Sequence, residues 1–134
     1  MSWDIFVQDL PRDAKFVKEI PSDFKPSYIG KRSTIIEKIR EVVPTADFSN
    51  LSWGRIDKDD WSIELNMGAD EDCMSFAFHV RGGDAALGVI AAILEHLNLR
   101  ALCPQTGGFF VVNTEAVEAF RKWRAYRDQV VEES

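Results

Sequence analysis

The stretch from residue 73 to residue 97 constrains the fold more than any other part of the chain. Its first part alternates between large apolar residues and small or polar ones. The large apolar positions are Met74, Phe76, Phe78 and Val80. A period of two is typical of a strand with one buried face, so these four side chains are expected to point into a core.

A glycine turn and an apolar helix follow this strand. Gly82 and Gly83 allow a sharp reversal that residues with a Cβ resist, and Asp84 is the expected N-cap of the helix. Residues 85–97 are almost all apolar, and a helix without a polar stripe is expected to be covered on most sides. If another element crosses closely at Gly88, Gly88→Leu is expected to destabilise the fold. The helix is too short to span a bilayer.

The remaining patterns predict one α+β domain over residues 1–134, with a tail that frays at about 131–134. Its sheet is expected to be mostly antiparallel, a meander plus a hairpin, with about three helices packed on the apolar face. The other predicted strands are 3–8, 51–56, 61–67, 99–103 and 109–112, and the other predicted helices are 31–43, capped by Ser33 or Thr34, and one that starts at Asn113 or Thr114. Residues 12–30 are expected to form an ordered connection, with one helical turn, that packs over the surface.

The strand at 61–67 is expected to pair with the one that follows it. With Trp61 near Val80 and Leu65 near Phe76, the apolar sides of the two strands coincide. The opposite face then collects polar residues. They are Ser62, Glu64, Asn66, Ser75, His79 and Arg81.

By the same alternation Ile56 is expected to point inward, and Trp53 and Arg55 outward, next to Glu64. Five residues of the polar face, extended in this way, form the candidate binding site. They are Trp53, Arg55, Glu64, His79 and Arg81. Glu64 and His79 on paired strands can do general acid–base work in a suitable pocket, but such a pair is also common surface electrostatics. Trp53 and Arg55 are residue types favoured as anchors at protein interfaces. The alternative for Trp53 is that the N-terminal connection or a helix covers it.

The charge of the chain is acidic and unevenly distributed. The 22 acidic and 16 basic residues give a net charge of −6, and seven acids against Lys58 between positions 57 and 72 account for all of it. The candidate acidic tips for a basic partner are Asp57, Asp59, Asp60, Asp70, Glu71 and Asp72. An acidic balance argues against nucleic acid, which needs clustered Lys and Arg, and it permits a cationic partner. Neither acidic loop has calcium-loop spacing, so solvated hairpin tips are expected.

Other patterns argue against several classes of protein. Cys73 and Cys103 form no CxxC motif and have no neighbours at zinc-ligand spacing, which predicts reduced thiols and neither a metal nor a cofactor. Residues 1–11 lack the basic start and the apolar run of a secretory signal. The chain is therefore expected to be cytoplasmic and to have no membrane partner.

The segments SWDIFVQDLP, SFAFHVRGGD and TGGFFVVNTEAVEAFRKWR resemble small, uncharacterised bacterial proteins, some of which are immunity proteins of polymorphic toxin systems. The resemblance implies a single-domain binder that is not an enzyme. The expected function is a protein-binding module of the immunity or inhibitor type that blocks a basic partner.

The alternative is a small-molecule-binding protein or enzyme that uses Glu64, His79 and Arg81. A deep pocket around these three residues would favour this alternative, whereas a flat solvated face would favour the binding module. In a third interpretation, the polar face is a homodimer contact.

Overall fold

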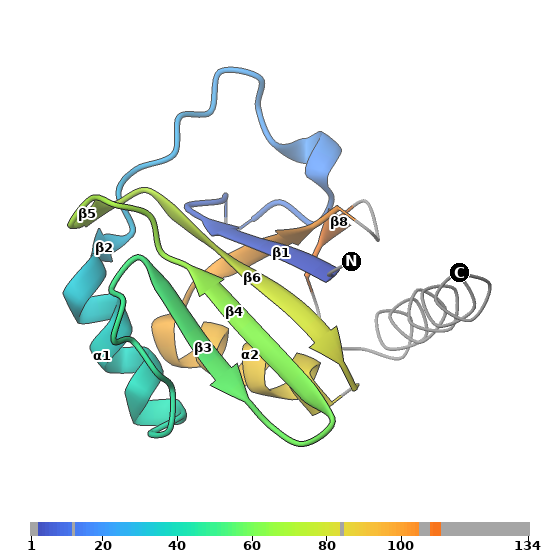
Figure 1. The fold of residues 1–134 in the computed structure, drawn as a ribbon. Helices are drawn as coiled ribbons and strands as arrows, with labels where there is room; N and C mark the ends of the chain where they lie inside the picture. Colours follow the sequence, from blue (N-terminus) through green and yellow to red (C-terminus); the bar gives the residue numbers. More distant parts are fainter. Residues whose placement is uncertain (1–2, 12, 84, 105–107, 111–134) are drawn as a thin grey trace, which may run out of the picture.

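The described part of the chain folds into an antiparallel sheet with two α-helices on one face (Figure 1). The structure, a computed structural model, describes residues 3–11, 13–83, 85–104 and 108–110. In spatial order the six strands of the large sheet are β3 (Trp53–Asp57), β4 (Trp61–Asn66), β6 (Ser75–Gly82), β1 (Trp3–Gln8), β7 (Arg100–Cys103) and β8 (Gly108–Phe109). All neighbouring pairs are antiparallel. The predicted α+β class with a mostly antiparallel sheet is confirmed.

The N-terminal strand β1 lies inside the sheet, between β6 and β7. On one side Ile5 pairs with Phe78, and on the other side Phe6 pairs with Leu102. Successive side chains of a strand point to opposite faces, so Ile5 is fully buried in the core whereas Phe6 lies on the opposite face and stays 40% exposed. The predicted strand at 3–8 has the observed bounds.

The meander formed by β3, β4 and β6 has its apolar sides aligned, but in a register that differs from the prediction. Trp61 pairs with Gly82 and Leu65 with Phe78, each two residues further along β6 than expected. Because side chains repeat with a period of two, this shift leaves the buried and polar faces unchanged.

Met74 was predicted to be buried, and this prediction is wrong. Met74 is 41% exposed, because the alternating run is interrupted there. The preceding strand β5 (Asp72–Cys73) leaves the large sheet and pairs with β2 (Gly30–Lys31) in a separate two-stranded ribbon. Regular alternation begins at β6, after Met74.

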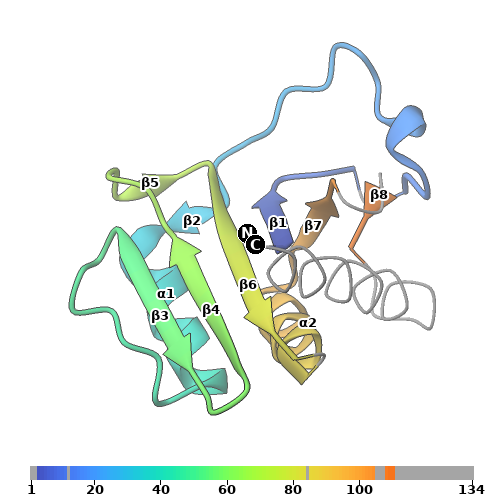
Figure 2. The ribbon, with the colours of Figure 1, turned by 45° about the vertical axis from the view of Figure 1, so that its right-hand side comes forward.

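Helices α1 (Arg32–Val42) and α2 (Ala85–Leu97) both cover the apolar face of the sheet, as Figure 2 shows. Their buried residues join the inward side chains of the strands in one core. Those of α1 are Ile35, Ile36 and Ile39, and those of α2 are Ala86, Leu87, Ile90, Ile93 and Leu94. Burial of each large aliphatic side chain contributes about 1.5–3 kcal/mol before chain entropy offsets it.

Helix α2 is buried or half-buried at eight of its thirteen positions, but it also has an exposed side among the described residues. Its exposed positions form a stripe along the helix: Ala85, Gly88, Ala92, Glu95 and His96. Small residues tolerate contact with water, so a helix can be apolar in sequence and still have a solvent face. A Cβ placed on Gly88 would meet no described atom within 4 Å, so no described element crosses α2 closely there.

The described residues contain two α-helices rather than about three. The third predicted helix, after Asn113 or Thr114, and the cap at Asp84 lie outside the described residues. No helix in the described ranges is long and apolar enough to cross a membrane.

The connection before α1 contains the predicted turn, the 3-10 helix η1 (Val17–Glu19). Its apolar side chains were expected to pack over the surface, but Phe16 and Tyr28 are 59% and 66% exposed. This prediction is therefore wrong for both aromatic residues.

The tip of the β3–β4 hairpin is tied to the end of β6. Gly82 has a φ of +98°, and a Cβ there would overlap the carbonyl oxygen of Asp60 and the backbone of Trp61. Gly83 donates a backbone hydrogen bond of 3.0 Å to that Asp60 oxygen. Gly82, where β6 ends before α2, therefore has to be a glycine, in agreement with the predicted glycine turn.

Candidate functional site

A row of polar side chains crosses four strands on the sheet face that points away from the helices. Arg55 on β3 pairs with Glu64 on β4, Glu64 pairs with His79 on β6, and His79 pairs with Asp4 on β1. Directly opposite residues on antiparallel strands lie close enough for their side chains to interact. The structure therefore brings together the predicted residues Arg55, Glu64 and His79 and adds Asp4.

Ion pairs connect this row to its surroundings. The Asp4 carboxylate accepts a hydrogen bond from Nδ1 of His79 at 2.7 Å. Arg81 donates to Oε1 of Glu64 at 3.3 Å, and Glu64 is only 16% exposed beneath its neighbours. Asp4, His79, Glu64 and Arg81 are thus each engaged by another side chain of this face.

Trp53 lies over the same face, as the alternation of β3 predicted. Its indole stacks on the His79 imidazole, with 5.8 Å between ring centroids and 20° between ring planes. Trp53 keeps 39% of its surface exposed, so the alternative in which another element covers it is not observed among the described residues. All five predicted residues of the candidate binding site lie on one face.

The outer edge of β3 is closed to an added strand. Asp47 forms an isolated bridge with Arg55, with backbone hydrogen bonds of 2.8 and 2.9 Å in the two directions. The Asp47 carboxylate accepts hydrogen bonds from the Ser49 hydroxyl and backbone N–H, which lowers the pKa of Asp47. A partner that docks here has to use side chains of the face instead of backbone groups of the edge.

The predicted acidic tips fall into two groups at opposite ends of β4. Asp57, Asp59 and Asp60 belong to the β3–β4 hairpin tip, where Arg55 donates to the Asp57 carboxylate at 3.2 Å. Asp59 and Asp60 are exposed, and no other described side chain forms a hydrogen bond with either of them. At about 3.4 Å per strand residue, the two groups lie roughly 20 Å apart.

The second acidic group, residues 70–72, is largely used inside the fold. Glu71 accepts hydrogen bonds from the Ser33 hydroxyl and from the Ser33 backbone N–H, which lowers the pKa of Glu71. Asp72 accepts a hydrogen bond from Lys31, which raises the pKa of Lys31. These two carboxylates hold the loop against the start of α1, so they are less suited to a partner than Asp59 and Asp60.

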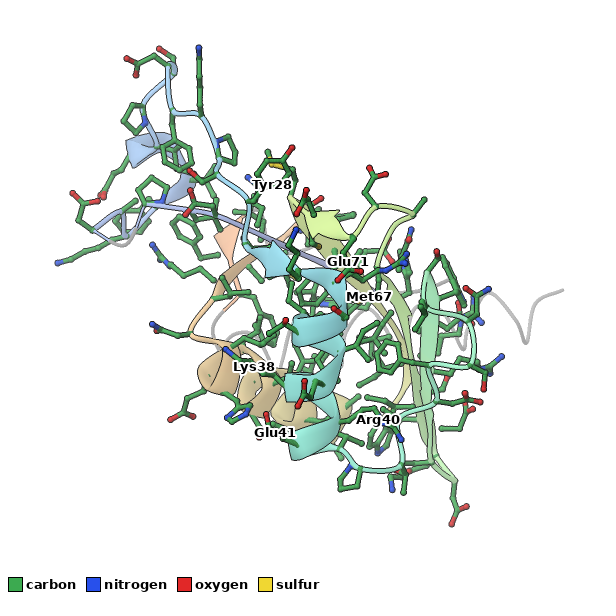
Figure 3. All side chains as sticks on the ribbon, turned by 90° about the vertical axis from the view of Figure 1, so that its left-hand side faces the viewer. Tyr28, Lys38, Arg40, Glu41, Met67 and Glu71 are labelled. Atoms are coloured by element: carbon green, nitrogen blue, oxygen red, sulfur yellow. The ribbon has the colours of Figure 1, made fainter. Side chains whose placement is uncertain are left out.

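A groove of about 460 Å³ lies at the same end of the molecule, lined by Tyr28 and residues 67–75. Figure 3 shows Tyr28, Met67 and Glu71, three of its lining residues, at the N-terminal end of α1. Its lining does not include Glu64, His79 or Arg81. The predicted acid–base residues are therefore not enclosed by this groove.

The cysteines lie in the core and are not joined by a disulfide. Burial raises the pKa of the Cys73 thiol, which disfavours the reactive thiolate. In the described ranges, no group of three or more His, Cys, Asp or Glu side chains is arranged to hold a metal ion.

Sequence reasoning missed Asp4 as a member of the site. The alternation of residues 3–8 put Asp4 on the polar side of its strand, but nothing in the sequence indicated that this strand would lie beside β6.

Comparison of the chain with family models, curated proteins and solved structures gave no significant match.

Proposed function

We propose that this protein is a protein-binding module whose contact surface is the polar sheet face around Trp53. The observation that carries the proposal is the exposed indole of Trp53, which lies at the edge of a row of charged side chains and stacks on His79. Trp and Arg are the residue types that most often dominate binding energy at interfaces, and Arg55 lies on the same strand. The module would act by occlusion, in the manner of an immunity or inhibitor protein.

The charge of the neighbouring hairpin favours a basic partner. Asp59 and Asp60 project from the tip beside this face without a partner among the described side chains. Carboxylates of this kind steer a cationic surface toward the site and add specificity more than affinity. Glu71 and Asp72 are left out of the proposed contact because they stabilise the fold.

The alternative, an enzyme that uses Glu64, His79 and Arg81, receives less support. These side chains are adjacent, as acid–base chemistry requires, but the groove described above lies elsewhere. Small-molecule sites usually bury most of their ligand in a cleft. Glu64, His79 and Arg81 do not line that groove, so contact with a protein surface suits them better than a small substrate.

Affinity capture from a lysate of the source organism tests the assignment of Trp53. Wild-type protein is expected to retain a basic protein that Trp53→Ala loses, because removal of a central aromatic anchor weakens binding by at least about 2 kcal/mol. Phe16→Ala is the control, because Phe16 is an aromatic residue on the N-terminal connection that is even more exposed than Trp53, 59% against 39%. Equal retention by Trp53→Ala and the wild type would refute the proposed surface.

Calorimetric titration with the captured partner at two salt concentrations tests the electrostatic part. Wild-type affinity is expected to fall as salt rises, since exposed charges are screened within about 10 Å at 0.1 M. The double variant Asp59→Asn, Asp60→Asn is expected to bind more weakly and to show a smaller salt dependence. If the affinity for the partner changes neither with salt nor in the double variant, the hairpin tip plays no part in binding.

A further inference from the structure

Trp53 and His79 stack although their strands are not neighbours. Strand β4 lies between β3 and β6, so the indole reaches over β4 to meet the imidazole. A tryptophan at the edge of a sheet can equally turn outward into solvent. Contact with His79 therefore determines that the indole lies over the polar face.

His79 is held in turn from the opposite side. Asp4, directly across from His79 on β1, forms the 2.7 Å hydrogen bond to Nδ1. The side chains are 22% and 33% exposed for His79 and Asp4, so water competes less with this bond than at a fully exposed site. The contacts form a continuous line from β1 through β6 to the edge strand β3.

The other charged groups on this face are engaged elsewhere. Arg81 donates to Glu64, and Arg55 donates to Asp57. Among the described residues, Asp4 provides the side-chain hydrogen bond to His79. The orientation of the imidazole thus depends on Asp4.

We propose that Asp4 is a positioning residue that fixes the imidazole of His79, which in turn fixes the indole of Trp53 over the sheet before any partner binds. The step from this order to binding rests on the proposed function, in which Trp53 is the anchor. An anchor that is ordered beforehand loses less conformational entropy on association. The order of the indole itself needs no partner and can be measured alone.

The test is ¹⁹F NMR of the full chain labelled with 5-fluorotryptophan. The chain has four tryptophans, and the resonance that disappears in Trp53→Phe identifies Trp53. Asp4→Leu keeps the size of the side chain but has no acceptor. It is expected to move the Trp53 resonance toward that of free 5-fluorotryptophan and to lower the ratio of stacked to unstacked indole roughly three- to tenfold, the effect of losing one hydrogen bond.

Two further variants of Asp4 separate positioning from general damage. Asp4→Asn keeps an acceptor oxygen, so it is expected to restore most of the wild-type signal. Asp4→Val, which suits a strand and also has no acceptor, replaces Asp4→Leu if that variant does not fold. The matched control is Asp57→Leu, which removes a carboxylate of the same face that bonds Arg55 and is expected to leave the Trp53 resonance in place.

The proposal is overturned if the Trp53 resonance of Asp4→Leu stays at the wild-type position, or if Asp57→Leu moves it as far. Because the measurement contains no partner, its result is independent of the capture experiment. If Trp53→Ala retains the partner as well as the wild type does, the proposed function is refuted, but the proposal that Asp4 orders the indole is unaffected.

Discussion

Gly54 sets how closely strand β3 approaches the chain that precedes it. A Cβ at this position would overlap the ring of Phe48, which is itself buried against the core. The side chain of Phe48 can fill this space only because residue 54 has none. The edge of the polar face, where Trp53 and Arg55 flank Gly54, therefore depends on a single missing methyl group.

Gly54→Ala is expected to lower the free energy of unfolding by about 1–3 kcal/mol, because the Phe48 ring has to leave its rotamer or the strand has to shift. Urea denaturation monitored by circular dichroism measures this change. An alanine variant as stable as the wild type would show that the ring moves aside at no cost.

Gly88→Ala is the matched control, because the same change is made where a methyl group meets no described atom. Alanine in an exposed helix interior is more stable than glycine by about 0.5–1 kcal/mol, so this variant is expected to be slightly more stable than the wild type. Destabilisation by Gly88→Ala would mean that the outer side of α2 is covered.

Helix α1 illustrates how an element can be completed by a segment far away in the sequence. Ser33 or Thr34 was predicted to cap it, but the N-cap residue is Lys31 and makes no side-chain capping bond. Glu71 instead accepts the Ser33 backbone N–H at 3.1 Å. The carboxylate also lies at the positive end of the helix dipole, which stabilises its charge.

Glu71→Gln is expected to reduce the dependence of the free energy of unfolding on pH at acidic pH. Because the folded-state pKa of Glu71 lies below its ordinary value, the ionised carboxylate stabilises the fold fully above about pH 4.5. This contribution is lost as the pH falls through the lowered pKa. Urea midpoints of wild type and variant should therefore differ at pH 7 and converge at low pH. Glu37→Gln, an exposed change on the same helix, is the control, and a constant difference across the pH range would contradict the role of Glu71.

At the scale of the whole molecule, the sequence predicted the elements better than their arrangement. β1, β4, β6 and α2 were placed within about two residues, because the strands have an apolar period of two and α2 is a nearly continuous apolar run. The shared face of Glu64, His79 and Trp53 followed from the same alternation. Which residues share a face could be inferred without knowing the register, because a register shift of two residues leaves every side chain on the same face.

What the sequence could not indicate depends on contacts between distant segments. The β2–β5 ribbon has strands of two residues, too short to give a period. The position of β1 beside β6 joins residues more than 70 positions apart, as for Asp4 and His79. The solvent stripe of α2 was missed because Ala and Gly are apolar enough to suggest burial and small enough to tolerate water.

The central place of β1 has a consequence for how the molecule is made. During synthesis β1 leaves the ribosome before the other described strands, and its two neighbours, β6 and β7, follow about 70 and 95 residues later. At roughly 5–20 residues per second, β1 waits for several seconds before β7 emerges. Until then its backbone groups on that side have no permanent partner, so the nascent chain is most exposed to mispairing just before the sheet closes.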